Sequence, residues 1–314
     1  MVFASDVCTS PLHARRVGGV LEFLGRSKSE RYFFGSNSRL GDVLQIPCGQ
    51  CAECRLKRSR EWAVRCMHEA SLHRDNCFLT LTYSGDSIHS VSLKYKHFSD
   101  FLKRLRSRFP KDKISFFACG EYGETNPVTK CIDGGKYRAH FHALLFNFNF
   151  PDRVPCRLLG SADMFNSAIL DATWGHGACK IGEVTFESAA YVARYAMKKV
   201  TGDLAKAAYT IITPDGEMIE RTPEMLVMSK RPAIGKLWFE RFGAHVYYRD
   251  KVIARGKEMQ PPRYYDKLLP EVVRGMVQRD RAAKGALRSE DNTDSRNNVR
   301  DVVVQAGISQ FNRD

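Results

Sequence analysis

The amino-acid sequence predicts an α+β fold with one central antiparallel sheet. Between residues 75 and 200, short segments rich in aromatic residues and threonine alternate with segments in which apolar residues recur at helical spacing. The first kind of segment predicts strands and the second predicts helices. The chain has 314 residues, of which 43% are hydrophobic, so it can bury one large core or two small ones.

The first 74 residues predict a cysteine-rich segment and one basic helix. Residues 1–47 hold short apolar runs among many Gly and Ser residues, and we expect irregular structure there. A helix is expected from about Glu53 to His73. Its apolar stripe follows helical spacing: Leu56, Ala63, Cys66, Met67 and Ala70. Its charge comes from five basic residues: Arg55, Lys57, Arg58, Arg60 and Arg65. These charges predict phosphate contacts, although basic residues also serve simply to solvate a helix surface.

Residues 75–200 predict the core of the fold. Strands are expected at 77–83, 114–121, 138–146 and 178–185. One helix is expected at 98–109, with Ser99 as its cap and Pro110 after its end, and a second at 164–174, ended by Gly175 and Gly177. A third helix is expected to begin near Glu187. The order β-α-β-β-α-β followed by a helix is that of the split βαβ, ferredoxin-like arrangement, which has a central antiparallel sheet.

Residues 201–285 predict an extension of that core, and residues 286–314 a disordered tail. Segments 209–212 and 217–220 flank Pro214-Asp215-Gly216, which predicts a hairpin. A basic and aromatic stretch follows around Trp238, which would either stack on unpaired bases or pack in the core. Residues 286–300 are polar, charged and nearly free of aliphatic side chains, which is typical of disorder.

The charge balance favours a polyanionic partner. Lys and Arg number 49 against 35 Asp and Glu, a net charge of +14, which suits nucleic acid first and an anionic membrane second. No apolar stretch reaches the roughly 18 residues of a spanning helix, and the N-terminus lacks the pattern of a signal peptide. We therefore expect no membrane association and a location in the cytosol. Ten cysteines there predict thiols or metal ligands in preference to disulfides.

A histidine pair in the third predicted strand points to a metal site. His140 and His142 are two residues apart, so their side chains project from one face of a strand. Two histidines usually need a third ligand, often a carboxylate. Glu121 is the candidate because it ends a strand expected to pair with the histidine strand, and Glu124 and Asp133 are its rivals. Mg²⁺ or Mn²⁺ suits a site that also binds phosphate.

Two tyrosines follow about fifty residues later. Tyr191 and Tyr195 are four residues apart, and on a helix both phenols share a face with Lys198. A phenol has a pKa near 10 and is a poor nucleophile until it loses its proton, which Lys198 and Lys199 would favour. Spacing alone fits packing residues on an amphipathic helix better. The adjacent lysines and the upstream histidine pair favour a covalent role.

Three cysteines at two-residue gaps, Cys48, Cys51 and Cys54, match the spacing of a thiolate metal site. A structural zinc would need a fourth ligand. Cys8 is one candidate, and Cys66 and His68 are others. Free thiols at the start of a helix remain the alternative, and a redox disulfide fits less well because nothing else resembles a thioredoxin fold.

The chain resembles the replication initiators of small circular single-stranded DNA phages, the Microviridae, and most closely their gokushovirus branch. Four stretches in this order carry the likeness: Cys48 to Arg60 with Trp62, Phe78-Leu79-Thr80-Leu81-Thr82-Tyr83, His140-Phe141-His142, and Tyr191 to Lys199. The likeness covers about residues 48–245. Arg194 stands where relatives often have lysine.

The resemblance implies a ferredoxin-like nuclease of the histidine-hydrophobic-histidine endonuclease superfamily. It implies rolling-circle replication in the host cytoplasm, with origin DNA, single-stranded or locally melted, as substrate and a host polymerase and helicase as partners. Metal-dependent nicking by tyrosine would give a 5′-phosphotyrosyl ester and a 3′-hydroxyl primer, followed by rejoining. The alternatives are a non-catalytic zinc-containing nucleic-acid-binding protein, a relaxase or transposase of the same superfamily, or an iron oxygenase with two histidines and a carboxylate.

Overall fold

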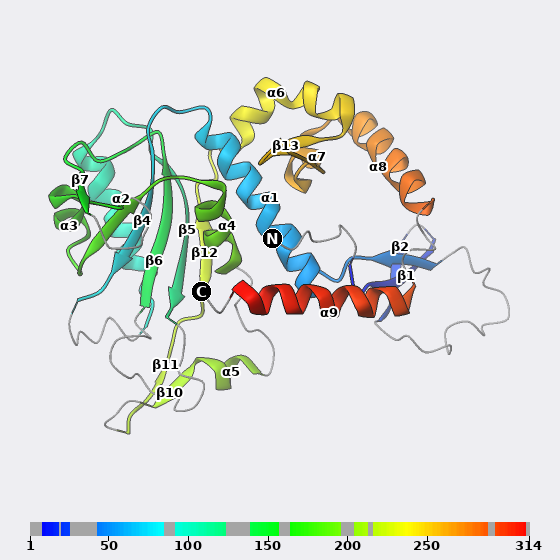
Figure 1. The fold of residues 1–314 in the computed structure, drawn as a ribbon, viewed down its shortest axis with the longest axis horizontal. Helices are drawn as coiled ribbons and strands as arrows, with labels where there is room; N and C mark the ends of the chain where they lie inside the picture. The colour runs from blue at the N-terminus through cyan, green and yellow to red at the C-terminus, as the bar shows by residue number, and fades with distance from the viewer. Residues whose placement is uncertain are drawn as a thin grey trace. The chain divides into compact units, whose positions relative to one another are not determined.

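The computed structural model of the chain describes residues 8–18, 20–25, 43–84, 92–123, 139–156, 164–195, 204–212, 216–287 and 293–311 (Figure 1). Two compact units divide it: Ser59–Leu268 forms the larger, and Met1–Arg58 with Leu269–Asp314 forms the smaller. The four-segment division expected from the sequence, with boundaries at 74, 200 and 285, stays a prediction. Across the described ranges, no helix is both long enough and apolar enough to cross a membrane.

The larger unit is built on a sheet of seven strands in the order β12-β5-β6-β4-β9-β8-β7. The strands are β4 Asn76–Thr82, β5 Ser115–Tyr122, β6 Ala139–Phe146, β7 Val154–Cys156, β8 Met164–Asn166, β9 Cys179–Gly182 and β12 Met225–Met228. Every neighbouring pair in this sheet is antiparallel. The α+β class and the large antiparallel sheet predicted from the sequence are confirmed.

Helices cover both faces of this sheet, which is why its central strands are almost continuously apolar (Figure 1). On one face, α2 (Tyr95–Arg108) and α3 (Ala168–Trp174) pack over Phe141 and Leu145 of β6. On the other face, the second half of α1 (Ala52–Ala70) and α4 (Phe186–Tyr195) pack over Leu144 and Phe146. Because side chains alternate along a strand, His140 and His142 point to the α1 and α4 face.

The predicted strands and the helices α1, α2 and α4 lie within a few residues of their expected bounds, but two details were wrong. Residues 164–174 form strand β8 and helix α3 instead of one helix. Ser167 separates them, because its hydroxyl oxygen accepts from the backbone N–H of Leu170 at 3.0 Å and so caps α3. Ser99 does not cap α2, which already begins at Tyr95, after Lys94.

The rest of the larger unit contains the predicted hairpin and a layer of aromatic residues. Strands β10 (Thr210–Ile212) and β11 (Met218–Glu220) pair antiparallel after α5 (Leu204–Tyr209). Then follow α6 (Lys236–Arg249), β13 (Val252–Ala254) paired with β14 (Lys257–Met259), and α7 (Arg263–Leu268). The ring of Trp238 stacks on His68, with centroids 3.5 Å apart, so Trp238 packs inside the unit.

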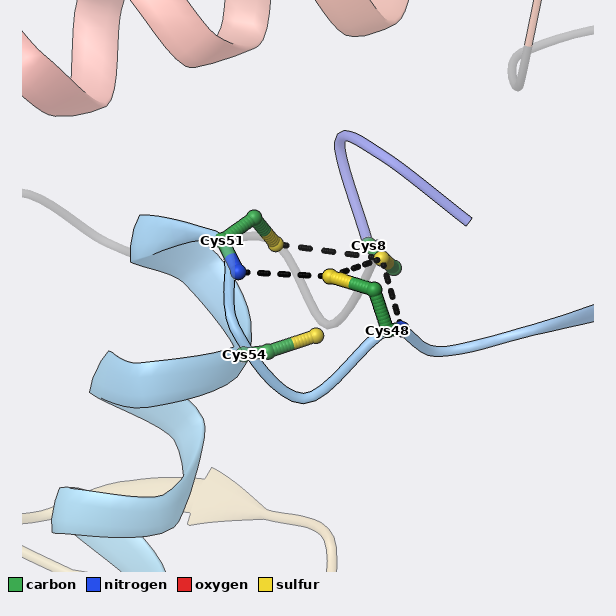
Figure 2. Close-up of side chains that lie close together, drawn as sticks. All are labelled: Cys8, Cys48, Cys51 and Cys54. Atoms are coloured by element: carbon green, nitrogen blue, oxygen red, sulfur yellow. Dashed lines mark hydrogen bonds between the residues drawn. The ribbon is translucent and has the colours of Figure 1, made fainter. Parts of the chain in front are cut away.

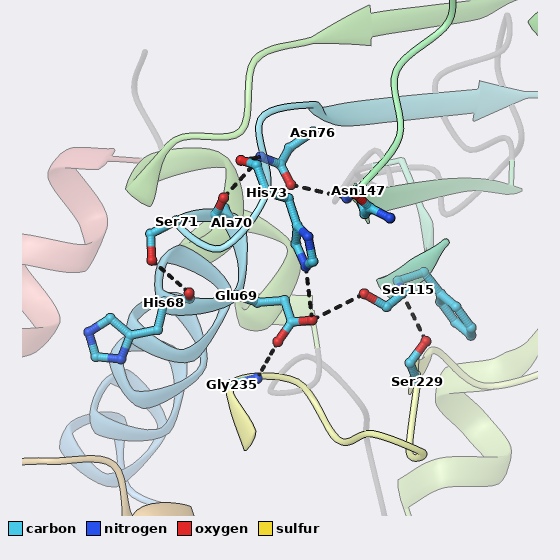
Figure 3. Close-up of polar contacts among 11 residues, drawn as sticks. His68, Glu69, Ala70, Ser71, His73, Asn76, Ser115, Asn147, Ser229 and Gly235 are labelled. Carbon is cyan, nitrogen blue, oxygen red and sulfur yellow. Dashed lines mark hydrogen bonds and ion pairs between the residues drawn. The ribbon is translucent and has the colours of Figure 1, made fainter. Parts of the chain in front are cut away.

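A buried carboxylate fastens the end of α1 to its neighbours (Figure 3). Glu69 accepts hydrogen bonds from the backbone N–H of Gly235 at 2.8 Å and from the hydroxyl of Ser115 at 3.3 Å, and it lies 3.6 Å from His73 Nε2. Gly235 has φ +78, and a Cβ there would lie 2.8 Å from the Tyr265 hydroxyl, so only glycine fits. These contacts hold α1 against β5 and the turn before α6.

The smaller unit differs from expectation at both of its ends. Within residues 1–47, predicted to be irregular, β1 (Leu12–Val17) pairs with β2 (Val20–Gly25) and with β3 (Val43–Ile46). After α8 (Glu271–Ala286), helix α9 spans Asp294–Phe311, where composition predicts disorder. Its Asn297 and Val304 are buried, and Asp301 accepts a hydrogen bond from Thr9 at 3.0 Å. Composition does not reveal such contacts, because they join residues far apart in the sequence.

Candidate active site

A carboxylate and two histidines converge where β5 and β6 run side by side. The register of the two strands places Glu121 opposite His140 and Cys119 opposite His142. The ligand atoms of Glu121, His140 and His142 all lie within 4.8 Å of one another. Glu121 Oε1 contacts Nε2 of both rings, at 3.2 Å for His142. The structure thus brings the expected third ligand to the histidine pair.

Residues of β4 hold His142 in place. The hydroxyl of Thr80 lies 3.1 Å from His142 Nδ1, which leaves Nε2 turned toward Glu121. The ring of Phe78 stacks on His142 with centroids 5.5 Å apart. The sequence analysis assigned no role to Phe78 or Thr80. Their two-residue spacing, on a strand expected in the same sheet, was the signal that could have found them.

The charge state of the site suits a cation. Burial alone would raise the pKa of Glu121, but hydrogen bonds and Coulomb attraction from His140 and His142 outweigh it, so the pKa is lowered. Burial lowers the pKa of His142 more than Glu121 raises it. Glu121 is therefore ionised while His142 is neutral near pH 7, and both forms are competent metal ligands.

One atom of the site is left without a partner. Glu121 Oε2 is buried and makes no hydrogen bond within the described part of the chain. A buried carboxylate oxygen without a donor is costly, and a bound cation would satisfy it. Two neutral imidazoles and one carboxylate form a donor set typical of divalent metals. The residues present therefore fit a metal ion.

Tyr191 reaches the same site from α4. Its hydroxyl donates to Glu121 Oε1 at 3.2 Å and lies 3.5 Å from His142 Nε2. The Arg194 guanidinium lies 5.6 Å from the centroid of the Tyr191 ring. The site therefore joins metal-ligand side chains from the sheet with one phenol from a helix.

Helix α4 is fixed at its start and along one side. The hydroxyl of Ser188 accepts from the backbone N–H of Thr185 at 2.9 Å, and the hydroxyl of Thr185 accepts from that of Ser188 at 3.1 Å. Ala189, Val192 and Ala193 are buried against the sheet. These contacts set the height and rotation of the helix, and with them the position of Tyr191.

Several expected site residues lie outside this geometry. The Tyr195 side chain, Lys198 and Lys199 are outside the described residues, as are the rival carboxylates Glu124 and Asp133. Tyr195 itself is the last residue of α4, one turn after Tyr191.

The basic residues of α1 do not share one role. Arg55 and Arg58 are exposed, while Lys57 and Arg60 are half-buried. Arg65 is buried and donates from Nε and Nη2 to the carbonyl oxygen of Ile234, at 3.1 and 2.8 Å. Its guanidinium lies 3.9 Å from the ring centroid of Trp62 and 3.8 Å from that of Tyr264. The expected phosphate contact is corrected for Arg65, because helical periodicity turns it into the protein.

The cysteines gather in the smaller unit, apart from this chemistry. Cys8, Cys48, Cys51 and Cys54 bring their sulfur atoms within 4.8 Å of one another (Figure 2). Of the three candidates for a fourth ligand, the structure brings Cys8. Cys66 is buried in the core beneath α4, and His68 stacks on Trp238 and lies 2.9 Å from the Tyr265 hydroxyl through Nδ1.

Comparison with known proteins points to one family. The family model for the phage "Replication-associated protein ORF2" group matches residues 76–200, which include Glu121, His140, His142 and Tyr191. The chain is 34% identical over 230 residues to replication-associated protein VP4 of Bdellovibrio phage phiMH2K, covering 70% of this chain and 66% of that protein. It is 30% identical over 280 residues to replication-associated protein ORF2 of Spiroplasma virus 4, covering 83% and 79%.

A third relative is replication-associated protein ORF4 of Chlamydia phage 1, 28% identical over 252 residues, with 77% of this chain and 58% of that protein covered. The chain thus spans slightly under two thirds of the Bdellovibrio phage protein and less of the Chlamydia phage protein. No solved structure matches the chain.

Proposed function

The chain belongs to the family of phage replication-associated proteins, and from this premise we propose that it initiates rolling-circle replication by nicking one strand of a phage origin through a tyrosyl ester. The observation that carries the proposal is the hydrogen bond from the Tyr191 hydroxyl to Glu121, within the Glu121–His140–His142 cluster. A nucleophile and a metal-ligand set in direct contact are what phosphoryl transfer to a phenol requires.

We assign the core of the sheet to the ferredoxin-like arrangement. The strand order β5-β6-β4-β9, with every pair antiparallel, supports this assignment. So does the packing of α2 and α3 against the same face of these strands. In this arrangement the opposite face is free to carry the site and α4.

Glu121, His140 and His142 would hold one Mg²⁺ or Mn²⁺ ion. The unpartnered Glu121 Oε2 and the neutral His142 support that role. When bound, such an ion polarises a phosphate oxygen and stabilises the charge of an in-line displacement. Thr80 and Phe78 act on the ion indirectly, by fixing the ring of His142.

Tyr191 would act as the nucleophile. Its phenol oxygen attacks the scissile phosphorus, the bond from phosphorus to the 3′-oxygen breaks, and the phenol proton passes to solvent while the 3′-oxygen takes one up. The products are a 5′-phosphotyrosyl ester and a free 3′-hydroxyl, which a host polymerase extends behind a host helicase. The ester conserves the phosphodiester, so attack by a later 3′-hydroxyl reseals the strand without ATP.

Tyr195 would alternate with Tyr191, since it lies one helical turn further along α4. One tyrosine holds the DNA while the other cuts the regenerated origin. Lys198 and Lys199 follow in the sequence and would bind the phosphate. The net charge of +14 favours capture of single-stranded or locally melted origin DNA.

The test is trapping of the covalent adduct. Single-stranded oligonucleotides that tile the parental genome are incubated with the full-length protein and Mn²⁺, each labelled at its 5′ or its 3′ end. We expect a protein-linked band only with 3′-labelled DNA, because the ester retains the downstream fragment. The 5′-labelled fragment should be free and extendable by a polymerase.

Phenylalanine variants identify the nucleophile. The double variant Tyr191→Phe, Tyr195→Phe should bind DNA and form no adduct, whereas Tyr248→Phe, on the exposed side of α6, should behave as wild type. DNA that is bound and left intact in the presence of Mn²⁺ would instead identify a non-catalytic binding protein. An undiminished adduct in the double variant would place the nucleophile elsewhere.

A further inference from the structure

Four cysteines of the smaller unit form a compact cluster that the nicking reaction does not use (Figure 2). The fold brings them together from three segments. Strands β1 and β3 pair antiparallel with Leu12 opposite Ile46, so Cys8, just before β1, and Cys48, just after β3, lie at the same end of the pair. Cys51 and Cys54 follow at the start of α1.

The distances suit four ligands around one ion. Cys8 Sγ lies 3.5 Å from Cys48 Sγ and 3.7 Å from Cys51 Sγ. Zinc–sulfur bonds of about 2.3 Å in a tetrahedron place the sulfur atoms about 3.8 Å apart. A disulfide would need about 2.05 Å, and all four cysteines are free.

Backbone N–H groups point at the sulfur atoms. Cys48 Sγ accepts from the N–H of Gln50 at 3.4 Å and from that of Cys51 at 3.2 Å, and Cys8 Sγ accepts from the N–H of Cys48 at 3.3 Å. Gly49 makes this turn with φ +72, in the left-handed region that glycine adopts without strain. Sulfur is a weak acceptor as a thiol and a much better one as a thiolate, so this loop is built for charged sulfur.

Cys54 lies in the first turn of α1, where free backbone N–H groups and the helix dipole favour a negative charge. The sequence around it therefore supports thiolates at both ends of the loop. Four thiolates held this closely would repel one another strongly without a cation between them.

We propose that Cys8, Cys48, Cys51 and Cys54 bind one Zn²⁺ ion in a closed structural site that joins the start of α1 to the end of the β1–β3 pair. Tetrahedral sites of four sulfur ligands hold zinc or iron, and zinc is the commoner occupant of structural sites that tie separated segments together. Four protein ligands leave no coordination position for a substrate, so the site stabilises the fold and takes no part in catalysis.

The proposal is tested on the full-length protein, purified without chelators from medium containing zinc and iron. Elemental analysis should find about one zinc per chain, and a mercurial that blocks thiols should release it to a colorimetric indicator. The double variant Cys8→Ser, Cys48→Ser should lose this zinc. Cys156→Ser changes a half-buried cysteine of β7 outside the cluster and is the matched control, which should retain it.

Two further measurements separate this site from the other metal-ligand set. The double variant His140→Ala, His142→Ala should still contain about one zinc, because the cysteines are untouched. Cobalt exchanged into the wild-type protein should show the sulfur-to-metal charge transfer and intense visible bands of a tetrahedral thiolate site, even if the cysteine variant fails to fold. Wild-type protein without zinc, with iron in its place, or with zinc lost only in the histidine variant would overturn the proposal.

Discussion

Changing Glu121 to glutamine tests the metal site most directly, because it removes one negative charge and keeps the shape of the side chain. In the protein without metal the cost of this change should be small. Glu121 Oε2 has no hydrogen-bond partner among the described residues, and replacing a buried, incompletely satisfied charge by a neutral group is often close to neutral for stability. The melting temperature without metal therefore serves as the control for folding.

With metal, the wild-type protein and the variant should separate. At a Mn²⁺ concentration of about 100 times the dissociation constant, binding raises the free energy of unfolding by about 2.7 kcal/mol. For a domain of about 200 residues each kcal/mol moves the melting temperature by about 2–4 °C, so the wild-type shift should be about 5–11 °C. A hundred-fold loss of affinity in the variant leaves about 0.4 kcal/mol and a shift of about 1–2 °C.

The assay is thermal unfolding of both proteins with and without Mn²⁺, with Glu183→Gln, an exposed glutamate of the same unit, as the matched variant. Glu183→Gln should keep the full wild-type shift. The reasoning fails if Glu121→Gln keeps that shift as well, or if the wild-type protein shows none at millimolar Mn²⁺.

The histidine pair should serve chemistry more than folding: His140→Ala should slow nicking by about 10²–10³, measured on an origin oligonucleotide, and leave the far-UV circular dichroism unchanged. Arg65→Ala should lower the free energy of unfolding in urea by about 2–4 kcal/mol, because it leaves the Ile234 carbonyl unpaired and opens space between two rings. Arg58→Ala, at an exposed position, should leave stability unchanged and reduce the slope of log DNA affinity against log salt by about 0.7. Burial lowers the pKa of His68 to about 4, so the unfolded chain takes up this proton first; stability from this group is complete above about pH 6.5 and falls by up to about 3 kcal/mol toward pH 4. Urea unfolding of His68→Gln should show a shallower decline over that range, and an identical decline would assign the acid sensitivity to other groups.

The metal-ligand set could be predicted from the sequence because strand geometry is local and regular. Two histidines two apart on a strand share a face whatever the rest of the chain does. Glu121 required one further step, that its strand pairs with the histidine strand, and the short chain segment between them favours that pairing. Phe78 and Thr80 depended on the same sheet, but a phenylalanine and a threonine in a strand carry no chemical signal of their own.

Other features depend on contacts that no local pattern encodes. The five basic residues of α1 looked equivalent, yet Arg65 lies within contact of Trp62 and Tyr264 while Arg55 is exposed. Composition predicted a disordered tail, but α9 buries Asn297 and Val304 and bonds to Thr9 near the other end of the chain. Cys8 was one of three candidates until the pairing of β1 with β3 placed it beside Cys48.

The position of the site follows from how the sheet face changes along its strands. On the face beneath α4, β5 carries Phe117 and Cys119 before Glu121, and β6 carries Phe146 and Leu144 before His142 and His140. The same face is therefore apolar at one end and metal-binding at the other. Helix α4 repeats this arrangement, since its buried alanines and valine pack on the apolar part while its tyrosine meets the ligands. A single packed cluster thus fixes the distance between the nucleophile and the metal ligands, and shifts of about 1 Å in such a distance are enough to slow a reaction by about a hundredfold.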